Sequence, residues 1–323
     1  MQRLYPFPRD VSGEAIYMQR YLVSSLIQSF AVLAAVLILV FFMVRITGDP
    51  AALMMAKEAS PEQIQAFRHE MGFDRPLIAQ FFDYVSKVVA GDFGDSLHYR
   101  VPALPLILER LPATLELATV ALLMAVIVGV PLGLIGGSSP GSKWDFVARA
   151  VGLLGQATPS YWLALMLIIV FAAQLGWFPT FGRSGPRSVV LPAFALSIST
   201  MGSLVRLTRS AVLEVRQEDY VRTAFSKGLS PQKVYLRHVL QNVAIPLVSV
   251  IGIQFGYMLG GSIYIETIFA WPGMGRIVAE SVSNRDFPLV QAIAFFTSVV
   301  IIVLNFLTDL AYGWFDPRIR YGR

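Results

Sequence analysis

The feature that most constrains this chain is the spacing of its charged residues. Six stretches of 18 or more residues contain no Asp, Glu, Lys or Arg, at 21–44, 117–142, 150–182, 188–205, 238–265 and 287–308. A helix needs about 20 apolar residues to cross the hydrocarbon of a bilayer, so each stretch is long enough or, for 188–205, nearly so. The apolar runs are continuous rather than alternating, which argues against a β-barrel. The sequence therefore predicts an all-α integral membrane protein with six transmembrane helices in a lipid bilayer.

The Lys and Arg residues between the predicted spans indicate the orientation. With the N-terminus inside, the cytoplasmic segments hold 15 Lys and Arg residues and the two short outer loops hold four. Cytoplasmic loops of membrane proteins carry the excess of basic residues. We therefore expect both termini in the cytoplasm. The net charge of +5 follows from this bias and requires no nucleic-acid partner.

This topology divides the chain into five parts. They are a cytoplasmic tail at 1–20, a first transmembrane helix at 21–44, an extracytoplasmic helical cap at 45–110, a domain of five transmembrane helices at 111–312 and a cytoplasmic tail at 313–323. In the cap, Ser60 and Gln63 predict a capped helix that ends at Gly72. A second, amphipathic helix is expected from Pro76 to Gly91, with its apolar face resting on the outer ends of the spans.

Small residues and prolines inside the spans predict how the helices pack and bend. Pairs at helix-packing spacing, which let backbones approach closely in lipid, are Gly129 with Gly133, Gly152 with Gly155, and Gly256 with Gly260. Prolines expected to kink or unwind a span locally are Pro159, Pro192 and Pro246.

The polar segment 214–242, between the fourth and fifth spans, has the pattern of two helices joined by a tight turn. Gly228 suits a left-handed turn position, and Ser230 followed by Pro231 is typical of a helix start. Because the segment is tethered to a membrane span on both sides, we expect it to bind no nucleic acid.

A short helical projection of this kind suits docking into a groove of a partner protein. We expect Tyr220, Ala224 and Leu229 to be buried in that groove. Arg222 and Lys227 are expected to form charged pairs at its rim.

The residues of this segment resemble a known family. They read Asp219-Tyr220-Val221-Arg222-Thr223-Ala224-Phe225-Ser226-Lys227-Gly228-Leu229-Ser230, then Arg237-His238-Val239-Leu240-Gln241-Asn242 and Pro246. This run resembles the coupling loop of the dipeptide and oligopeptide (peptide/nickel) permease family of ABC importers. In the wider importer superfamily the loop carries E-A-A, three residues and then glycine. Glu218 and Ala224 are spaced differently here, and Gln241 replaces a common proline, as is typical of the peptide branch.

Other parts of the chain carry the same resemblance, in order and on the predicted sides. They are Gly91-Asp92-Phe93-Gly94-Asp95-Ser96, Arg110-Leu111-Pro112-Ala113-Thr114-Leu115-Glu116-Leu117, Glu266-Thr267-Ile268-Phe269, Trp271-Pro272-Gly273-Met274-Gly275 and Arg285-Asp286 to Gln291. Each run alone is a weak signal, and together they are a specific one.

The resemblance implies a type I ABC importer permease fold, in the plasma (inner) membrane of a bacterium, that works by alternating access. It implies a complex with a homologous second permease subunit, two ABC ATPase subunits and an extracytoplasmic substrate-binding protein. The residues it assigns to the ATPase-coupling loop are Glu218, Asp219, Tyr220, Arg222, Thr223, Ala224, Lys227, Gly228, Leu229, Ser230 and His238. ATP and Mg are expected on the partner ATPases, and dipeptides or oligopeptides are the expected cargo.

The chain itself is expected to be non-catalytic and to bind no cofactor. It has no cysteine, no G-x-x-x-x-G-K-[ST] phosphate loop, no G-x-S-x-G elbow and no pair of histidines at zinc-ligand spacing. Ionisable residues at membrane depth are functional candidates by default. The candidate residues for the pathway or gate are Gln254, Tyr257, Glu266 and Trp271.

Three alternatives remain open at the level of sequence. The same architecture could import nickel, glutathione or oligosaccharide, because relatives with those cargoes share the coupling loop. A membrane-embedded enzyme would turn over a substrate without an ATPase partner. A secondary transporter would move cargo on an ion gradient alone, although paired buried acids are missing from the predicted spans.

The cysteine-free chain allows a test of the topology by labelling single introduced cysteines from outside the cell. We expect modification of Ser96→Cys and Ser184→Cys and protection of Ser226→Cys. External labelling of Ser226→Cys in sealed cells would overturn the orientation given by the basic residues.

Overall fold

The computed structural model describes residues 11–46, 49, 51, 52, 55 and 59–315, and every regular element of three or more residues among them is a helix. The α-helices are α1 (Val11–Ile46), α3 (Pro61–Glu70), α4 (Leu77–Val89), α5 (Ala103–Ser138), α6 (Lys143–Ala157), α7 (Ser160–Leu167), α8 (Val190–Val215), α9 (Asp219–Ser226), α10 (Pro231–Val234), α11 (Leu240–Ile268), α12 (Met274–Ser283) and α13 (Phe287–Phe315). Two π-helical turns, η1 (Ile168–Gln174) and η2 (Tyr235–Val239), complete the set. The all-α prediction is confirmed.

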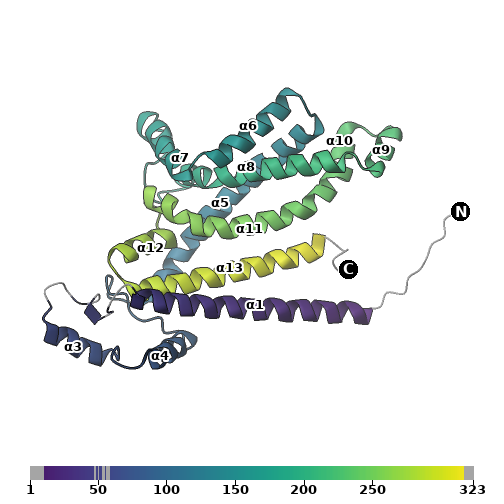
Figure 1. Ribbon diagram of the computed structural model, residues 1–323. Coiled ribbons are helices and arrows are strands. Elements are labelled where there is room, and N and C mark those ends of the chain that lie inside the picture. Colours follow the sequence, from purple (N-terminus) through teal and green to yellow (C-terminus); the bar gives the residue numbers. More distant parts are fainter. Residues whose placement is uncertain (1–10, 47–48, 50, 53–54, 56–58, 316–323) are drawn as a thin grey trace.

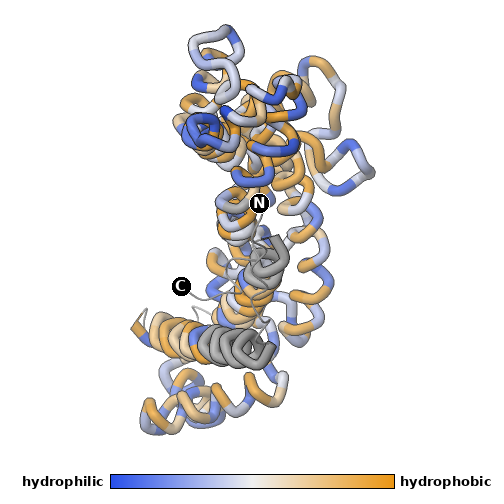
Figure 2. The backbone as a smooth tube through the Cα atoms, turned by 90° about the vertical axis from the view of Figure 1, so that its right-hand side faces the viewer, coloured by the Kyte–Doolittle hydropathy of each residue, from blue (hydrophilic) through white to orange (hydrophobic). Residues whose placement is uncertain are grey.

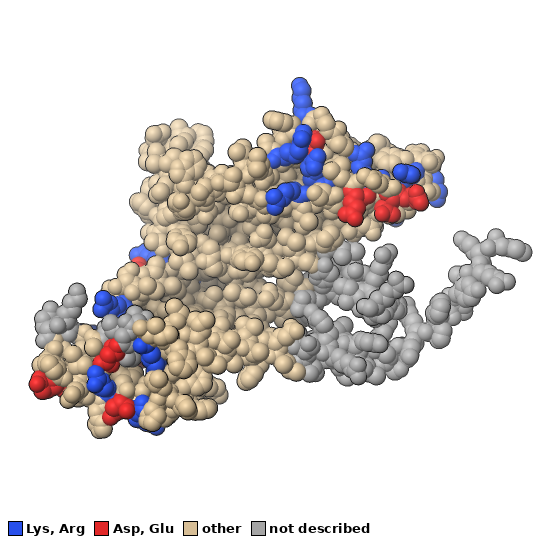
Figure 3. Space-filling model, in the orientation of Figure 1, with Lys and Arg blue, Asp and Glu red and all other residues tan. Residues whose placement is uncertain are grey.

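Long apolar helices form the body of the molecule. In the described residues, five helices are long and apolar enough to cross a membrane, and a sixth crossing results if the bent pair α6 with α7 and η1 counts as one span. Helices α3, α4 and α12 gather at one end of the bundle, and α9 and α10 project from the other (Figure 1). Charged side chains on the face in Figure 3 gather at these two ends, with a wide uncharged band between them. The structure therefore agrees with the six-span prediction when the bent pair is taken as one broken span.

The break in the third span lies where the sequence places Pro159. Helices α6 and α7 are bent by 100° relative to each other across Thr158 and Pro159. Proline lacks a backbone N–H and disfavours the helical conformation of the preceding residue, so Thr158 adopts an extended backbone instead. The other two prolines do not break a helix, because Pro192 lies in the first turn of α8 and α11 continues through Pro246.

Helix α8 is the centre of the bundle. Of its apolar window, 61% is buried inside the chain, compared with 17% for α1 and for α13. It packs mainly against α5 and α6. A span enclosed by protein does not need the hydropathy of a span that faces lipid, which explains why the sequence signal for 188–205 was marginal.

Glycines bring α5 and α6 into backbone contact with α8. A Cβ at Gly133 of α5 would lie 2.6 Å from the Thr208 Cβ, and one at Gly155 of α6 would lie 2.7 Å from the Ile198 carbonyl oxygen. The first two predicted glycine pairs therefore act in helix packing. The third does not, because Gly256 has only a side-chain atom at 3.9 Å and Gly260 has nothing within 4 Å of its Cβ position.

The cap contains the two predicted helices. Ser60 and Gln63 form a reciprocal capping box at the start of α3, and Gly72 follows it in a left-handed conformation. Helix α4 ends before Gly91, also left-handed. Only part of the apolar face of α4 rests on a span, which corrects the expectation that the whole face does so.

We expect the close approach of α5 and α8 at Gly133 to contribute to the free energy of unfolding. Gly133→Ala should lower the free energy of unfolding by about 1–3 kcal/mol, because the new methyl group must displace α8. Gly260→Ala is the matched control, since it is also a helix position but has open space around it. Thermal unfolding of the detergent-purified chain measures both. Equal midpoints for the two variants would show that the α5–α8 contact is not tight.

Candidate functional site

The segment between α8 and α11 folds as the sequence predicts. Helix α9 is followed by Gly228 in a left-handed conformation, with φ of 76° and no neighbouring atom within 4 Å of its Cβ position. Pro231 begins α10, and Ser230 takes the N-cap position, although its side chain makes no capping hydrogen bond. The turn therefore depends on the freedom of glycine at one position and on the proline start of the next helix.

One face of this segment is part of the protein core. Val221, Ala224 and Val234 are buried in the same hydrophobic cluster as residues of α5 and α8. The hydroxyl of Tyr235 donates a hydrogen bond of 3.2 Å to the carbonyl of Ser138 at the end of α5. The segment is thus a fixed projection of the bundle. The expectation that Ala224 is free to enter a partner is wrong, because its own chain buries it.

The other face of this segment is exposed on the described chain, and we call it the bare face. The predicted coupling residues that are exposed are Glu218, Asp219, Tyr220, Arg222, Thr223, Lys227, Gly228 and Ser230, whereas Leu229 and His238 are half-buried. The Asp219 side chain is fully exposed and that of Arg222 is 72% exposed, 3.9 Å apart. A shallow hollow adjoins the turn and is lined by Ser230, Gln232, Lys233, Leu236, Arg237 and Gln241. This face offers charged and polar groups beside a few apolar ones.

An ion pair that the sequence did not suggest holds the base of this projection. Asp145, at the start of α6, is 3% exposed and accepts a 2.5 Å hydrogen bond from Nε of Arg209 in α8. It also accepts from the backbone N–H of Gly141 at 2.9 Å. Removing one partner of a buried pair leaves the other charge uncompensated. From the sequence, Asp145 can be recognised only as an acidic residue in the first turn of a helix, three residues after its N-cap Ser142. Its pairing with Arg209 depends on the packing of two helices.

At the opposite end of the bundle, Glu266 and Trp271 are inside the protein. Glu266 has no exposed surface and accepts hydrogen bonds from the Thr114 hydroxyl at 2.8 Å and from the backbone N–H of Arg276 at 3.1 Å. Trp271 donates through Nε1 to the Ala113 carbonyl at 2.9 Å. Both residues tie α12 and the end of α11 to α5. Neither reaches the surface of the described chain in this conformation, and a gating role for them stays a prediction.

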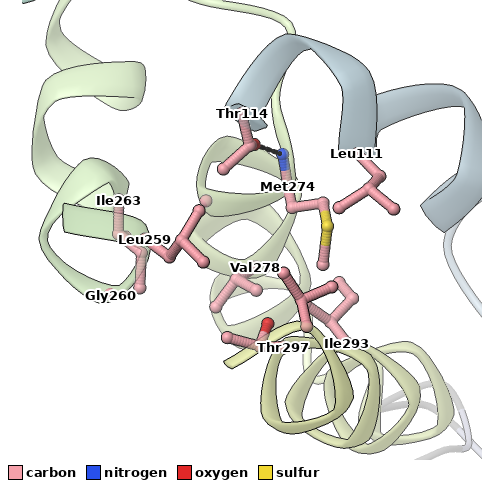
Figure 4. A pocket seen from close by; sticks show the side chains of 11 residues that line it. Leu111, Thr114, Leu259, Gly260, Ile263, Met274, Val278, Ile293 and Thr297 are labelled. Atoms are coloured by element: carbon pink, nitrogen blue, oxygen red, sulfur yellow. Dashed lines mark hydrogen bonds between the residues drawn. The ribbon is translucent and has the colours of Figure 1, made fainter. Parts of the chain in front are cut away.

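Helix α11 carries a bare stripe, whose members recur every three or four residues: Ile253, Tyr257, Gly260, Tyr264 and Thr267. Tyr257 is 73% exposed, and Gln254 lies beside the stripe, half-buried. Next to Gly260 a small apolar pocket opens between α5, α11, α12 and α13, with Leu111, Met274 and Ile293 pointing into it (Figure 4). The hydrogen bond from the Met274 backbone N–H to the Thr114 hydroxyl borders this pocket.

Two of the sequence runs that carry the resemblance contact each other. The Ser96 hydroxyl donates to the carboxylate of Asp286, which also accepts from the His98 backbone N–H at 3.2 Å. Both Ser96 and Asp286 are buried. Ser96 is therefore a poor labelling position, and the exposed Asp95 is the better choice for the topology test.

A second contact joins the same two parts of the chain. The Tyr99 hydroxyl donates to Glu280 at 2.6 Å, and Arg276 donates to the same carboxylate. Burial and the bond to Glu280 raise the pKa of Tyr99 to about 12. Desolvation opposes the charged form of Glu280, but the hydrogen bonds from Tyr99 and Arg276 outweigh it and lower the pKa of that carboxyl.

The described residues include no group of three or more His, Cys, Asp or Glu side chains that could hold a metal ion. Together, the helical bundle, the broken span and the projecting helix pair define a polytopic membrane protein with a short helix pair exposed at one end. The class is that of membrane-embedded transport subunits.

Comparisons with known proteins identify the family. The model of the binding-protein-dependent transport system inner membrane component matches residues 129–321, and that of the N-terminal part of such components matches 18–118. The chain belongs to this family and is a permease subunit of an ABC importer. It resembles a probable peptide ABC transporter permease of Sinorhizobium fredii, with 36% identity over 93% of this chain and 99% of that protein. It also resembles the glutathione transport system permease GsiC of Escherichia coli K12, with 38% identity over 94% and 100%.

Solved structures support the fold. The methionine ABC transporter MetNI matches with a TM-score of 0.54 and 17% identity over 66% of this chain and 97% of that chain. A crystallised amino acid ABC transporter matches with a TM-score of 0.51 and 20% identity over 65% and 94%. The type I importer permease fold is confirmed. The family is one of transport permeases, which decides against the secondary-transporter alternative.

Proposed function

We propose that this permease takes up peptides and is coupled to ATP hydrolysis through the bare face of α9 and α10. The observation that carries the proposal is the division of this segment into two faces. Val221, Ala224 and Val234 fix one face to the core, whereas the side chains of Asp219 and Arg222 on the other face are exposed and pair only loosely with each other, at 3.9 Å. A partner that moves this face would move α8 with it.

The partner that fits this face is an ABC ATPase subunit, which holds ATP and Mg. The complex contains two such subunits, a homologous second permease and an extracytoplasmic substrate-binding protein. The bare stripe of α11 lies towards the second permease and lines the pathway between the two. The α9 end faces the cytoplasm of a bacterium and the α3 end faces outwards, an orientation that the distribution of basic residues supports.

The cargo is the peptide class. Two kinds of relatives support this, one named as a peptide permease and the other as a glutathione permease, and glutathione is itself a short peptide. Tyr257 and Tyr264 on the stripe offer apolar rings with polar hydroxyl groups, which suits an amphipathic substrate. Nickel fits less well, because the described chain presents no cluster of ligands along this stripe.

The turn at Gly228 allows a direct test in the reconstituted complex. Gly228→Val places a β-branched side chain in a left-handed conformation, which costs roughly 1–2 kcal/mol and should distort the bare face without touching the spans. We expect normal membrane insertion with loss of uptake, and either loss of ATPase retention or hydrolysis that no longer responds to cargo.

Arg222→Glu should lower uptake more mildly than Gly228→Val, since an exposed ion pair contributes up to about 1 kcal/mol.

Gly176→Val is the matched control. Gly176 has φ of 63° and open space around its Cβ position, but it lies at the end of η1, away from α9. It carries the same backbone strain and should retain uptake coupled to hydrolysis. Parent-level uptake and cargo-stimulated hydrolysis in Gly228→Val would exclude this segment as the coupling element.

A further inference from the structure

Helix α4 has an apolar surface in two stripes, and its own chain covers only one. At roughly 100° per residue, Phe81, Tyr84 and Val88 fall on one side, together with the exposed Leu77 at the start of the helix. Ile78, Phe82, Val85 and Val89 fall on a second side next to it, and of these only Val85 is half-buried. We call these two sides the packed stripe and the bare stripe of α4; the latter is distinct from the bare stripe of α11. The exposed fractions of Ile78, Phe82 and Val89 are 73%, 64% and 81%.

The packed stripe meets α1 at a single turn. The Phe41 ring lies 5.2 Å from that of Phe81 and 5.9 Å from that of Tyr84, measured between centroids. Arg45, one turn further along, donates to the Gln80 side chain at 2.7 Å. These contacts involve Phe41 and Arg45, which are one turn apart on α1. Helix α4 thus crosses α1 at one level.

That level lies near the end of the apolar part of α1. The apolar span of α1 runs from Ile27 to Ile46, so Phe41 is about 7.5 Å inside its end at 1.5 Å per residue. Amphipathic helices at a membrane surface bury their apolar face about 5–10 Å into the boundary between headgroups and acyl chains. The level at which α4 meets Phe41 is a comparable distance from the end of this apolar segment.

The surroundings of α4 favour lipid over protein as the occupant. Helices α3 and α4 lie on the side of α1 away from α8 and α11, at the edge of the bundle in both views (Figures 1 and 2). At the same level, α1 exposes apolar side chains of its own, among them Phe42 and Ile46. The bare stripe therefore continues an exposed apolar surface of the predicted first span.

We propose that α4 is an interfacial helix whose bare stripe is seated in the adjacent leaflet of the bilayer. Its charged residues are Asp83 and Lys87, and Asp83 pairs with Arg75. With one acid and one base, α4 has no excess of positive charge with which to recognise anionic lipid. Binding of α4 to the leaflet therefore depends on the burial of apolar side chains and is independent of lipid charge. It holds the cap at a fixed height above the membrane.

Single cysteines carrying a small fluorophore test this in the full-length, otherwise cysteine-free chain in lipid nanodiscs. The test positions are Phe82→Cys and Val89→Cys. Lys87→Cys, on the opposite side of the same helix, is the matched control for water, and Phe30→Cys of α1, 77% exposed, is the reference for lipid. Nitroxide-bearing phosphatidylcholine quenches from the membrane and iodide quenches from water.

We expect labels at Phe82 and Val89 to lose most of their emission to the nitroxide lipid and little to iodide, as at Phe30, whereas the label at Lys87 should show the reverse. Replacing phosphatidylcholine by phosphatidylglycerol should leave this pattern unchanged. Quenching by iodide at Phe82 and Val89 as strong as at Lys87 would overturn the proposal. Protection of both labels from both quenchers would also overturn it, because it would indicate that a protein covers the stripe. Lipid quenching that occurs only with phosphatidylglycerol would overturn it as well.

Discussion

The close contact of α5 and α6 with α8 is the interaction on which the rest of the structure depends. Apolar side chains gain little by leaving lipid for a protein interior, so association in a membrane relies on close packing and on polar contacts. Gly133 and Gly155 supply the first, since neither site has room for a Cβ. Asp145 and Arg209 supply the second at the α9 end. Together they make α5, α6 and α8 one unit.

This unit determines what α9 and α10 can do. Val221 and Val234 belong to the same core cluster, and Tyr235 bonds to the end of α5, so the projecting segment is fixed to the packed helices. A movement imposed on its bare face would therefore reach the packed helices through these contacts. The π-helical turn η2 lies just beyond, at the start of α11, and π-helical turns of this kind often occur at functional sites.

Features set by local chemistry could be predicted from the sequence. The charge-free stretches predicted the spans, Pro159 the break, and Gly228 with Pro231 the turn, because each depends on residues within one segment. Features set by contacts between distant segments could not. The sequence does not indicate that Thr114 would bridge Glu266 and Met274, or that Asp145 would meet Arg209. The spacing of Gly256 and Gly260 predicted a contact that the chain does not make.

The central claim is that the projecting segment and the packed helices move as one body. The most direct measurement is the distance between spin labels at Ser226→Cys of α9 and Lys143→Cys of α6, both exposed, in the reconstituted complex with and without bound ATP. The account predicts the same distance distribution in both states, while the distance from Ser226→Cys to a label on the second permease changes. A nucleotide-dependent shift between the Ser226 and Lys143 labels would contradict it, because α9 would then move independently of the core.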